Sequence, residues 1–155
     1  MAAIATNRGL IDVTDVGGET GTPIIFLHGV GSDKSVWTPQ LDHFSRQRRA
    51  VALSYPGYGD STFVPGATRE DYAAAVVGVM DAIAIDRAHI CGLSLGGVVA
   101  LRRAVHHKIM GSCHRHHFTA GGRKLTRVHS QTISHKTIMG WLLTNAPPRE
   151  PWALI

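Results

Sequence analysis

Ser94 is flanked by glycines, between an apolar run at residues 88–93 and a segment of helical character that begins at Leu95. The pattern Gly-x-Ser-x-Gly at the junction of a strand and a helix is typical of a nucleophilic serine. The sharp turn raises the hydroxyl above the edge of a sheet, and Gly92 and Gly96 avoid collisions with the strand and the helix. We therefore predict that Ser94 is a nucleophile. The alternative is a glycine-rich phosphate-binding turn in which Ser94 only caps the helix, although neither a Walker lysine nor Gly-x-Gly-x-x-Gly accompanies it.

A second glycine-marked turn, His28-Gly29-Val30-Gly31, follows an earlier apolar run. Attack by a serine on a carbonyl creates an oxyanion, which needs backbone N–H donors placed around it. We predict that the amides of Val30 and Leu95 form this oxyanion hole, with Gly29 and Gly31 allowing the backbone to turn inward. His28 is interpreted as a residue that shapes the loop, not as the catalytic base, because it precedes the serine on the wrong segment for that role.

The elements that must position these turns alternate between strand and helix. Short apolar runs predict buried strands, and helical spacing follows each of them. Thr68 and Asp71 resemble a capping box at the start of the longest helix. The expected strands are residues 23–29, 49–57 and 88–94, the expected helices 36–44, 68–85 and 95–107, and a hairpin is expected around 9–17. This alternation predicts an α/β fold, a parallel sheet with helices on its faces and with both glycine turns at the carboxyl ends of strands.

Three motifs occur in order: LHGVGSDKSVW from Leu27, YPGYGDS from Tyr55 and GLSLGG from Gly92. Together they resemble the α/β-hydrolase fold family, in particular its esterase and lactonase branch, over residues 23–100. The resemblance implies a serine hydrolase that acts on a small ester or lactone through an acyl-enzyme, with Ser94 as nucleophile and no cofactor. It also places three aromatic residues in loops that border the pocket, although packing is the favoured interpretation for each: Trp37, Tyr55 and Tyr58.

The partners of the nucleophile are not identifiable in this sequence. The family places an acid and then a histidine on late strands after the serine, whereas 61 residues follow Ser94 and Glu150 is the one acidic residue beyond residue 100. None of the late histidines follows a strand and a glycine in the family's manner. We therefore expect a partial α/β-hydrolase fold that lacks the C-terminal strands. The alternative function is a catalytically inactive hydrolase fragment, or an interaction fragment with a basic tail.

The charge reverses along the chain. Residues 1–100 contain seven Lys and Arg against ten Asp and Glu, a net charge of −3, whereas residues 101–155 contain nine against one, a net charge of +8. Seven of the ten histidines lie between His106 and His135. We predict that residues 1–107 are the N-terminal portion of a hydrolase domain and that residues 108–155 are a basic, poorly structured tail. Out-of-frame translation after a frameshift near residues 101 to 108 is our hypothesis for this reversal.

The basic tail contains metal-ligand residue types, but their spacing does not favour a zinc site: Cys113, His114, His116 and His117. Nucleic-acid binding through the positive charge is disfavoured as well, because aromatic residues are few and no nucleic-acid-binding fold is recognisable. No apolar run reaches membrane-spanning length and no leader is evident, so we expect a cytoplasmic protein with reduced thiols. A sheet that ends at the strand 88–93 would expose that edge and favour self-association.

Overall fold

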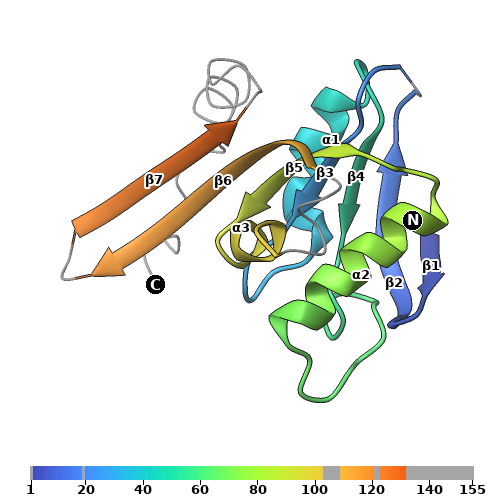
Figure 1. Cartoon of the computed structure of the whole chain (residues 1–155), viewed down its shortest axis with the longest axis horizontal. Helices are drawn as coiled ribbons and strands as arrows, with labels where there is room; N and C mark the ends of the chain where they lie inside the picture. The colour runs from blue at the N-terminus through green and yellow to red at the C-terminus, as the bar shows by residue number, and fades with distance from the viewer. Residues whose placement is uncertain (1, 19, 103–108, 121–122, 132–155) are drawn as a thin grey trace.

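The computed structural model describes residues 2–18, 20–102, 109–120 and 123–131, and within them the strands form one sheet. The sheet has seven strands in the order β1-β2-β4-β3-β5-β6-β7 (Figure 1). The strands are β1 (Ala2–Thr6), β2 (Gly9–Val16), β3 (Ile24–Leu27), β4 (Ala50–Leu53), β5 (Ala88–Leu93), β6 (Ile109–Ala120) and β7 (Arg123–Gln131). Strands β4, β3 and β5 are parallel, and β1 and β2 form an antiparallel hairpin. The predicted α/β fold is confirmed, whereas the hairpin expected around 9–17 lies earlier in the chain, because Gly9–Val16 is a single strand that pairs with Ala2–Thr6.

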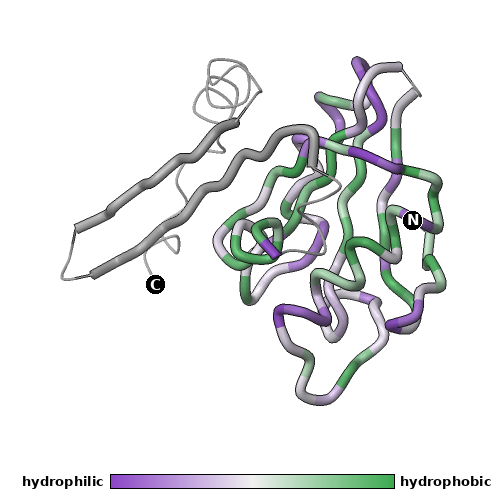
Figure 2. Tube along the Cα trace, viewed as in Figure 1, coloured by the Kyte–Doolittle hydropathy of each residue, from purple (hydrophilic) through white to green (hydrophobic). Residues whose placement is uncertain are grey.

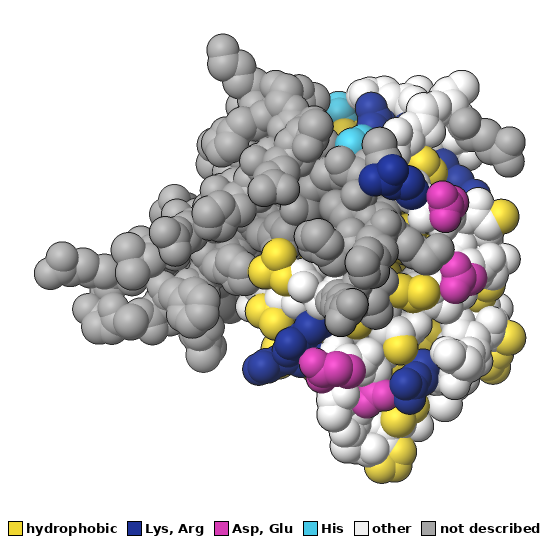
Figure 3. Space-filling model, viewed as in Figure 1, with side chains coloured by type: hydrophobic (Ala, Val, Ile, Leu, Met, Phe, Trp, Pro, Cys, Tyr) yellow, Lys and Arg dark blue, Asp and Glu magenta, His cyan; other side chains and the backbone are white. Residues whose placement is uncertain are grey.

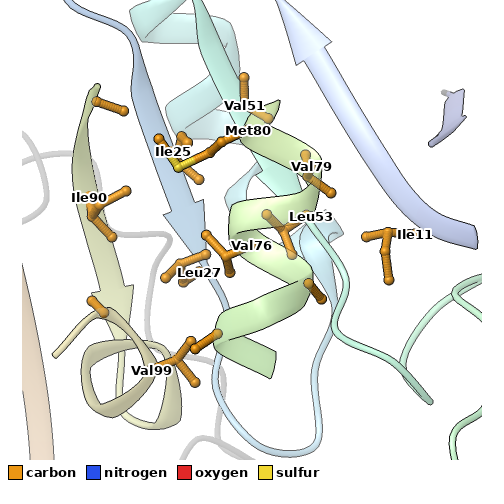
Figure 4. Packing of buried hydrophobic residues seen from close by; sticks show 14 of the residues in the cluster. Ile11, Ile25, Leu27, Val51, Leu53, Val76, Val79, Met80, Ile90 and Val99 are labelled. Carbon is orange, nitrogen blue, oxygen red and sulfur yellow. The ribbon is translucent and has the colours of Figure 1, made fainter. Parts of the chain in front are cut away.

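The apolar runs are continuous because the central strands are covered on both faces. In β3, Ile25 and Leu27 belong to a core cluster with α2 (Arg69–Ala82), whereas Ile24 and Phe26 belong to a second cluster with α1 (Thr38–Phe44). Figure 4 shows Ile25 and Leu27 of the first cluster beside Val76 and Met80 of α2. Hydrophobic residues accordingly follow the central strands in Figure 2.

The helices begin and end largely where local chemistry predicts. At the start of α2, the Thr68 hydroxyl accepts from the Asp71 amide at 3.3 Å and the Asp71 carboxylate accepts from the Thr68 amide at 2.9 Å, which confirms the capping box. A 3-10 turn, η1 (Lys34–Trp37), precedes α1, which has a proline in its first turn. Helix α3 (Leu95–Ala100) is shorter than expected, and residues 103–107 of the expected helix lie outside the described residues.

Two strands lie where the sequence analysis expected none. Strand β6 pairs in parallel with β5, from Ala88 opposite Ile109 to Leu93 opposite Arg115, and β7 pairs antiparallel with β6. This region has no strand-like alternation, but its backbone pairs with groups of β5 that would otherwise be unpaired. The expectation that β5 is an edge strand is therefore corrected, because β1 and β7 are the outer strands of the described sheet.

Candidate active site

The carboxyl ends of β3, β4 and β5 meet at one edge of the sheet. Leu27 is in register with Leu53 of β4 and with Gly92 of β5. The chain leaves β3 at His28 and leaves β5 at Ser94, so the two glycine-marked turns emerge side by side. In an open parallel sheet this edge is where ligands bind.

Ser94 has a backbone conformation that residues other than glycine rarely adopt, with φ 50° and ψ −109°. It occupies the position before the first turn of α3, yet its side chain forms no capping hydrogen bond. The alternative in which Ser94 caps the helix therefore does not fit the geometry. Its half-buried hydroxyl has no hydrogen-bond partner among the described residues.

Gly92 and Gly96 allow the strand, the turn and the helix to pack closely. A Cβ atom on Gly92 would overlap the backbone of Gly96, and a Cβ atom on Gly96 would overlap the carbonyl group of Leu27 in β3. Any side chain at either position would separate β5 from α3 or α3 from β3. The two glycines of the motif thus hold Ser94 at the sheet edge.

The turn after β3 passes directly beside Ser94. A Cβ atom built on Gly29 would lie 3.6 Å from the Ser94 Cβ atom, and Gly31 has φ +74°, which favours glycine. Between them, Val30 exposes 72% of its surface. Neither the Val30 amide nor the Leu95 amide has a backbone or side-chain acceptor among the described residues. Among the described residues, two N–H groups without an acceptor thus lie near Ser94, one on the next residue, Leu95, and one on Val30, which follows Gly29.

His28 is fully buried, and both of its ring nitrogens are engaged. Nδ1 donates to the Gly29 carbonyl at 2.7 Å, and Nε2 accepts from the Tyr55 amide at 3.1 Å. Nε2 can accept that hydrogen bond only in the neutral ring, and burial lowers the pKa of His28 below its ordinary value, which also favours the neutral form. His28 thus links the turn after β3 to the end of β4.

Three tyrosines pack around His28. The ring centroids of His28 and Tyr55 are 4.4 Å apart, and Tyr55 stacks on Tyr72 of α2 at 4.9 Å. Tyr58 meets the edge of His28 at 5.0 Å. Tyr55 is completely buried and burial raises its pKa well above the ordinary value, so it packs and does not line a pocket. Trp37 is also in the core, against Phe26.

A buried ion pair, which sequence reasoning did not find, supports the same edge. Lys34 Nζ lies 2.7 Å from Asp12 Oδ2, and the two side chains are 9% and 7% exposed. The Ser54 hydroxyl donates to the same carboxylate at 3.3 Å, and the Ser61 hydroxyl donates to the Ser54 carbonyl at 2.8 Å. The network joins β2, the start of η1 and the loop after β4.

An open cleft of about 480 Å³ adjoins the candidate oxyanion hole. Val30 and Leu95 line it, together with Tyr58. Its further lining includes residues that the sequence analysis did not single out, from the first turns of α2 and the end of α3: Arg69, Glu70, Tyr72 and Arg102. No motif marks these residues, because they become neighbours only when α2 packs beside α3.

No catalytic base adjoins Ser94 in the part of the chain that the structure describes with side chains. Apart from His28, the histidines there are His43 on α1 and His89 at the start of β5, and neither forms a hydrogen bond with Ser94. Glu150 and the side chains of the candidate zinc ligands on β6 lie outside that part. Within the described residues there is no cluster of three or more metal-ligand side chains, and none of the helices is long and apolar enough to span a membrane.

Comparison with known proteins identifies similar chains. The model of the alpha/beta hydrolase family matches residues 24–154. A 3-oxoadipate enol-lactonase of Acinetobacter baylyi is 34% identical over 85 residues, which are 55% of this chain and 32% of that protein. An uncharacterized carboxylesterase of Bacillus subtilis is 34% identical over 98 residues, covering 61% of this chain and 32% of that protein.

The comparison of structures agrees with the comparison of sequences. The crystal structure of the enol-lactonase from Burkholderia xenovorans superposes with a TM-score of 0.62 and 31% identity, covering 70% of this chain and 44% of that one. The chain thus spans less than half the length of these relatives. Because the family model matches most of the sequence and the described fold agrees with it, this chain belongs to the alpha/beta hydrolase family.

Proposed function

We propose that this chain is the nucleophile-bearing part of a serine hydrolase that acts on small esters or lactones through an acyl-enzyme. The observation that supports this most directly is the geometry at Ser94. A strained backbone holds the hydroxyl at the sheet edge near the amides of Val30 and Leu95, and none of these three groups has a hydrogen-bond partner among the described residues. The lactonase and carboxylesterase relatives favour this substrate class.

In the proposed reaction, the Ser94 oxygen attacks the carbonyl carbon of the ester. The carbonyl oxygen becomes an oxyanion, which accepts hydrogen bonds from the Val30 and Leu95 amides. The tetrahedral intermediate expels the alcohol oxygen, which takes up a proton, and leaves an ester between the acyl group and Ser94. Water then attacks this acyl-enzyme, releasing the acid and restoring the serine hydroxyl.

A base must accept the proton of Ser94 during attack. His28 does not fit this role, because both its ring nitrogens are engaged and burial favours its neutral form with Nε2 already accepting from Tyr55. The base is therefore proposed to come from outside the side chains that the structure describes. Without it, the oxyanion hole and substrate binding alone still provide some catalysis, so weak turnover does not demonstrate a complete triad.

Labelling with a neutral alkyl fluorophosphonate tests the proposal. We expect the full chain to be labelled, because the phosphonate reacts with activated serines, and we expect no labelling of Ser94→Ala. Ser35→Ala is the matched control, since Ser35 is an exposed serine in η1 that should not affect labelling. Absence of labelling in folded protein would contradict the proposal and favour the inactive fragment.

Two variants of Val30 test the proposed oxyanion hole. Val30→Pro removes the amide N–H and should slow labelling about 100-fold or more, whereas Val30→Ala keeps the N–H and should label normally. The Val30 side chain is 72% exposed, so truncating it costs little packing. Circular dichroism of both variants separates a loss of the donor from a loss of the fold.

A further inference from the structure

The cleft beside the proposed oxyanion hole combines apolar and charged walls. Val30 and Leu95 lie next to Ser94 in sequence or space, and the rings of Tyr58 and Tyr72 add aromatic surface. The charged lining residues are Arg69 and Glu70 at the start of α2 and Arg102 after α3. In Figure 3, basic and acidic side chains lie close together over the region where α2 begins.

The positive charge in the cleft is only partly neutralised. Arg102 Nη1 lies 3.3 Å from Glu70 Oε1, in a pair whose glutamate is 68% exposed and therefore strongly solvated. The Arg69 guanidinium forms no ion pair within the described part of the chain. These three lining side chains thus have a net charge of +1.

Arg102 has a hydrogen-bond donor that the described residues do not use. Its Nε atom is buried and has no partner among them, although the side chain as a whole is 36% exposed. A buried N–H without an acceptor is unfavourable, so a shift of this partly exposed side chain that brings Nε to an acceptor in the cleft gains a bond that the described residues do not provide. A carboxylate can accept from Nε and an Nη atom of one guanidinium at the same time.

The distance from the Leu95 amide to Arg102 limits the length of a ligand that contacts both. Helix α3 rises about 8 Å between Leu95 and Ala100, and Arg102 lies two residues beyond its end. A short carbon chain with a carbonyl group near one end and a carboxylate at the other spans such a gap. The apolar walls between Val30 and Tyr72 suit its methylene groups.

We propose that this cleft selects esters or lactones that bear a free carboxylate, which Arg69 and Arg102 bind while the reacting carbonyl meets the Val30 and Leu95 amides. This inference rests on the proposed function for the assignment of the reacting carbonyl. Arg69 and Arg102 act as specificity-determining residues, and Glu70 tunes them by neutralising part of the positive charge.

Binding of two unreactive amides tests the carboxylate site in the full chain. Adipamate, a six-carbon monoamide with one carboxylate, should shift the NMR signals of the Leu95 amide and of the Arg102 Nε–H. The neutral diamide adipamide has the same length and should bind at least about tenfold more weakly. Equal binding of the two amides, no binding of adipamate, or equal shifts with inorganic phosphate would overturn the proposal.

Single variants then assign the contacts. Arg69→Gln and Arg102→Gln should each weaken adipamate binding about fivefold or more, whereas Glu70→Gln should strengthen it, because it removes a competing carboxylate. Arg87→Gln is the matched control, since Arg87 is an exposed arginine just before β5 that does not line the cleft. An equal loss in Arg87→Gln would mean that only overall charge matters and would overturn the site.

Competition with the fluorophosphonate separates this inference from the proposed function. Protection of Ser94 from labelling by adipamate, but not by adipamide, supports both. Labelling without protection leaves the serine hydrolase intact and overturns the carboxylate site. Adipamate binding that depends on Arg102, in a protein that is not labelled, supports the carboxylate site and contradicts the proposed function.

Discussion

The backbone at Ser94 has a positive φ of 50°, in a region that residues other than glycine rarely adopt. A conformation of this kind costs about 1–3 kcal/mol and persists only where the surroundings impose it. Here β5 ends immediately before Ser94 and α3 begins immediately after it. Strain of this kind clusters at functional sites, which favours a chemical role for the exposed side of the turn.

The tight crossing at Gly92 leads to a stability prediction. Gly92→Ala places a methyl group inside the backbone of Gly96, so we expect a loss of about 3 kcal/mol in the free energy of unfolding, measured by urea denaturation. Gly18→Ala is the control, because no atom lies within 4 Å of the added methyl group and the free energy should change little. Similar losses in the free energy of unfolding for Gly92→Ala and Gly18→Ala would contradict the close contact between Gly92 and the Gly96 backbone.

The neutral state of His28 makes folding stability depend on pH. Burial lowers the pKa of His28 below the ordinary value of 6.5, which applies to the unfolded chain. Between these two pKa values the unfolded state binds more protons, so the free energy of unfolding falls as the pH drops below about 6.5, by at most about 1.4 kcal/mol per pH unit.

Urea denaturation between about pH 7.5 and pH 5.5 measures this dependence. His89 contributes in the same direction, because burial and then the charge of Arg48 lower its pKa. The substitutions His89→Gln and His28→Gln should therefore each reduce the pH dependence of the free energy of unfolding by the contribution of that histidine. An unchanged slope in His28→Gln would show that His28 is not the neutral, buried group described above.

Among the elements, a polar network links the segments that lie near Ser94. Asp12 in β2 binds Lys34 after the glycine turn and also accepts from the Ser54 hydroxyl at the end of β4. Gly59 allows the next loop to approach, since a Cβ atom there would lie 2.7 Å from the Ser54 hydroxyl oxygen. The position of the Val30 amide thus depends on contacts made several residues away.

Lys34→Met tests how much this ion pair contributes. It leaves the Asp12 carboxylate buried without its cation, and removal of one partner from a buried pair typically costs about 3–5 kcal/mol. We expect a loss of this size by urea denaturation and slower labelling of Ser94. The double variant Asp12→Asn/Lys34→Met should lose less than Lys34→Met alone, and a larger loss in the double variant would contradict the pairing.

The sequence predicts elements whose signals are local. The apolar run of β3, the capping box at Thr68 and the turn at Ser94 all depend on neighbouring residues, and the structure places each of them as expected. The Asp12–Lys34 pair escapes prediction because Asp12 stands between Ile11 and Val13, so alternation alone suggests a position facing solvent. Lys34 after β3 and the loop after β4, whose Asp60 amide donates to the Asp12 carboxylate at 3.4 Å, bury it in the folded chain.

At the scale of the molecule, the sheet extends beyond the region of clear sequence signals. Strand β6 covers β5, so association through β5, as expected from the sequence, would require β6 to leave first. The backbone pairing of β6 and β7 was not predictable, because the basic segment shows neither the alternation nor the helical stripe that periodicity analysis detects. The composition of the basic segment bears on how the segment arose.

Net charge changes from −3 over residues 1–100 to +8 over residues 101–155, and Asp disappears from the second segment. The family model extends over this segment as well, but its composition favours a change of reading frame near residues 101 to 108, which we propose as the cause. The coding DNA downstream should then encode, in another frame, further alternating strands and helices with an acidic loop and a late histidine in the order of the family. Sequencing and translation of all three frames checks this. Early stop codons in both other frames would refute it.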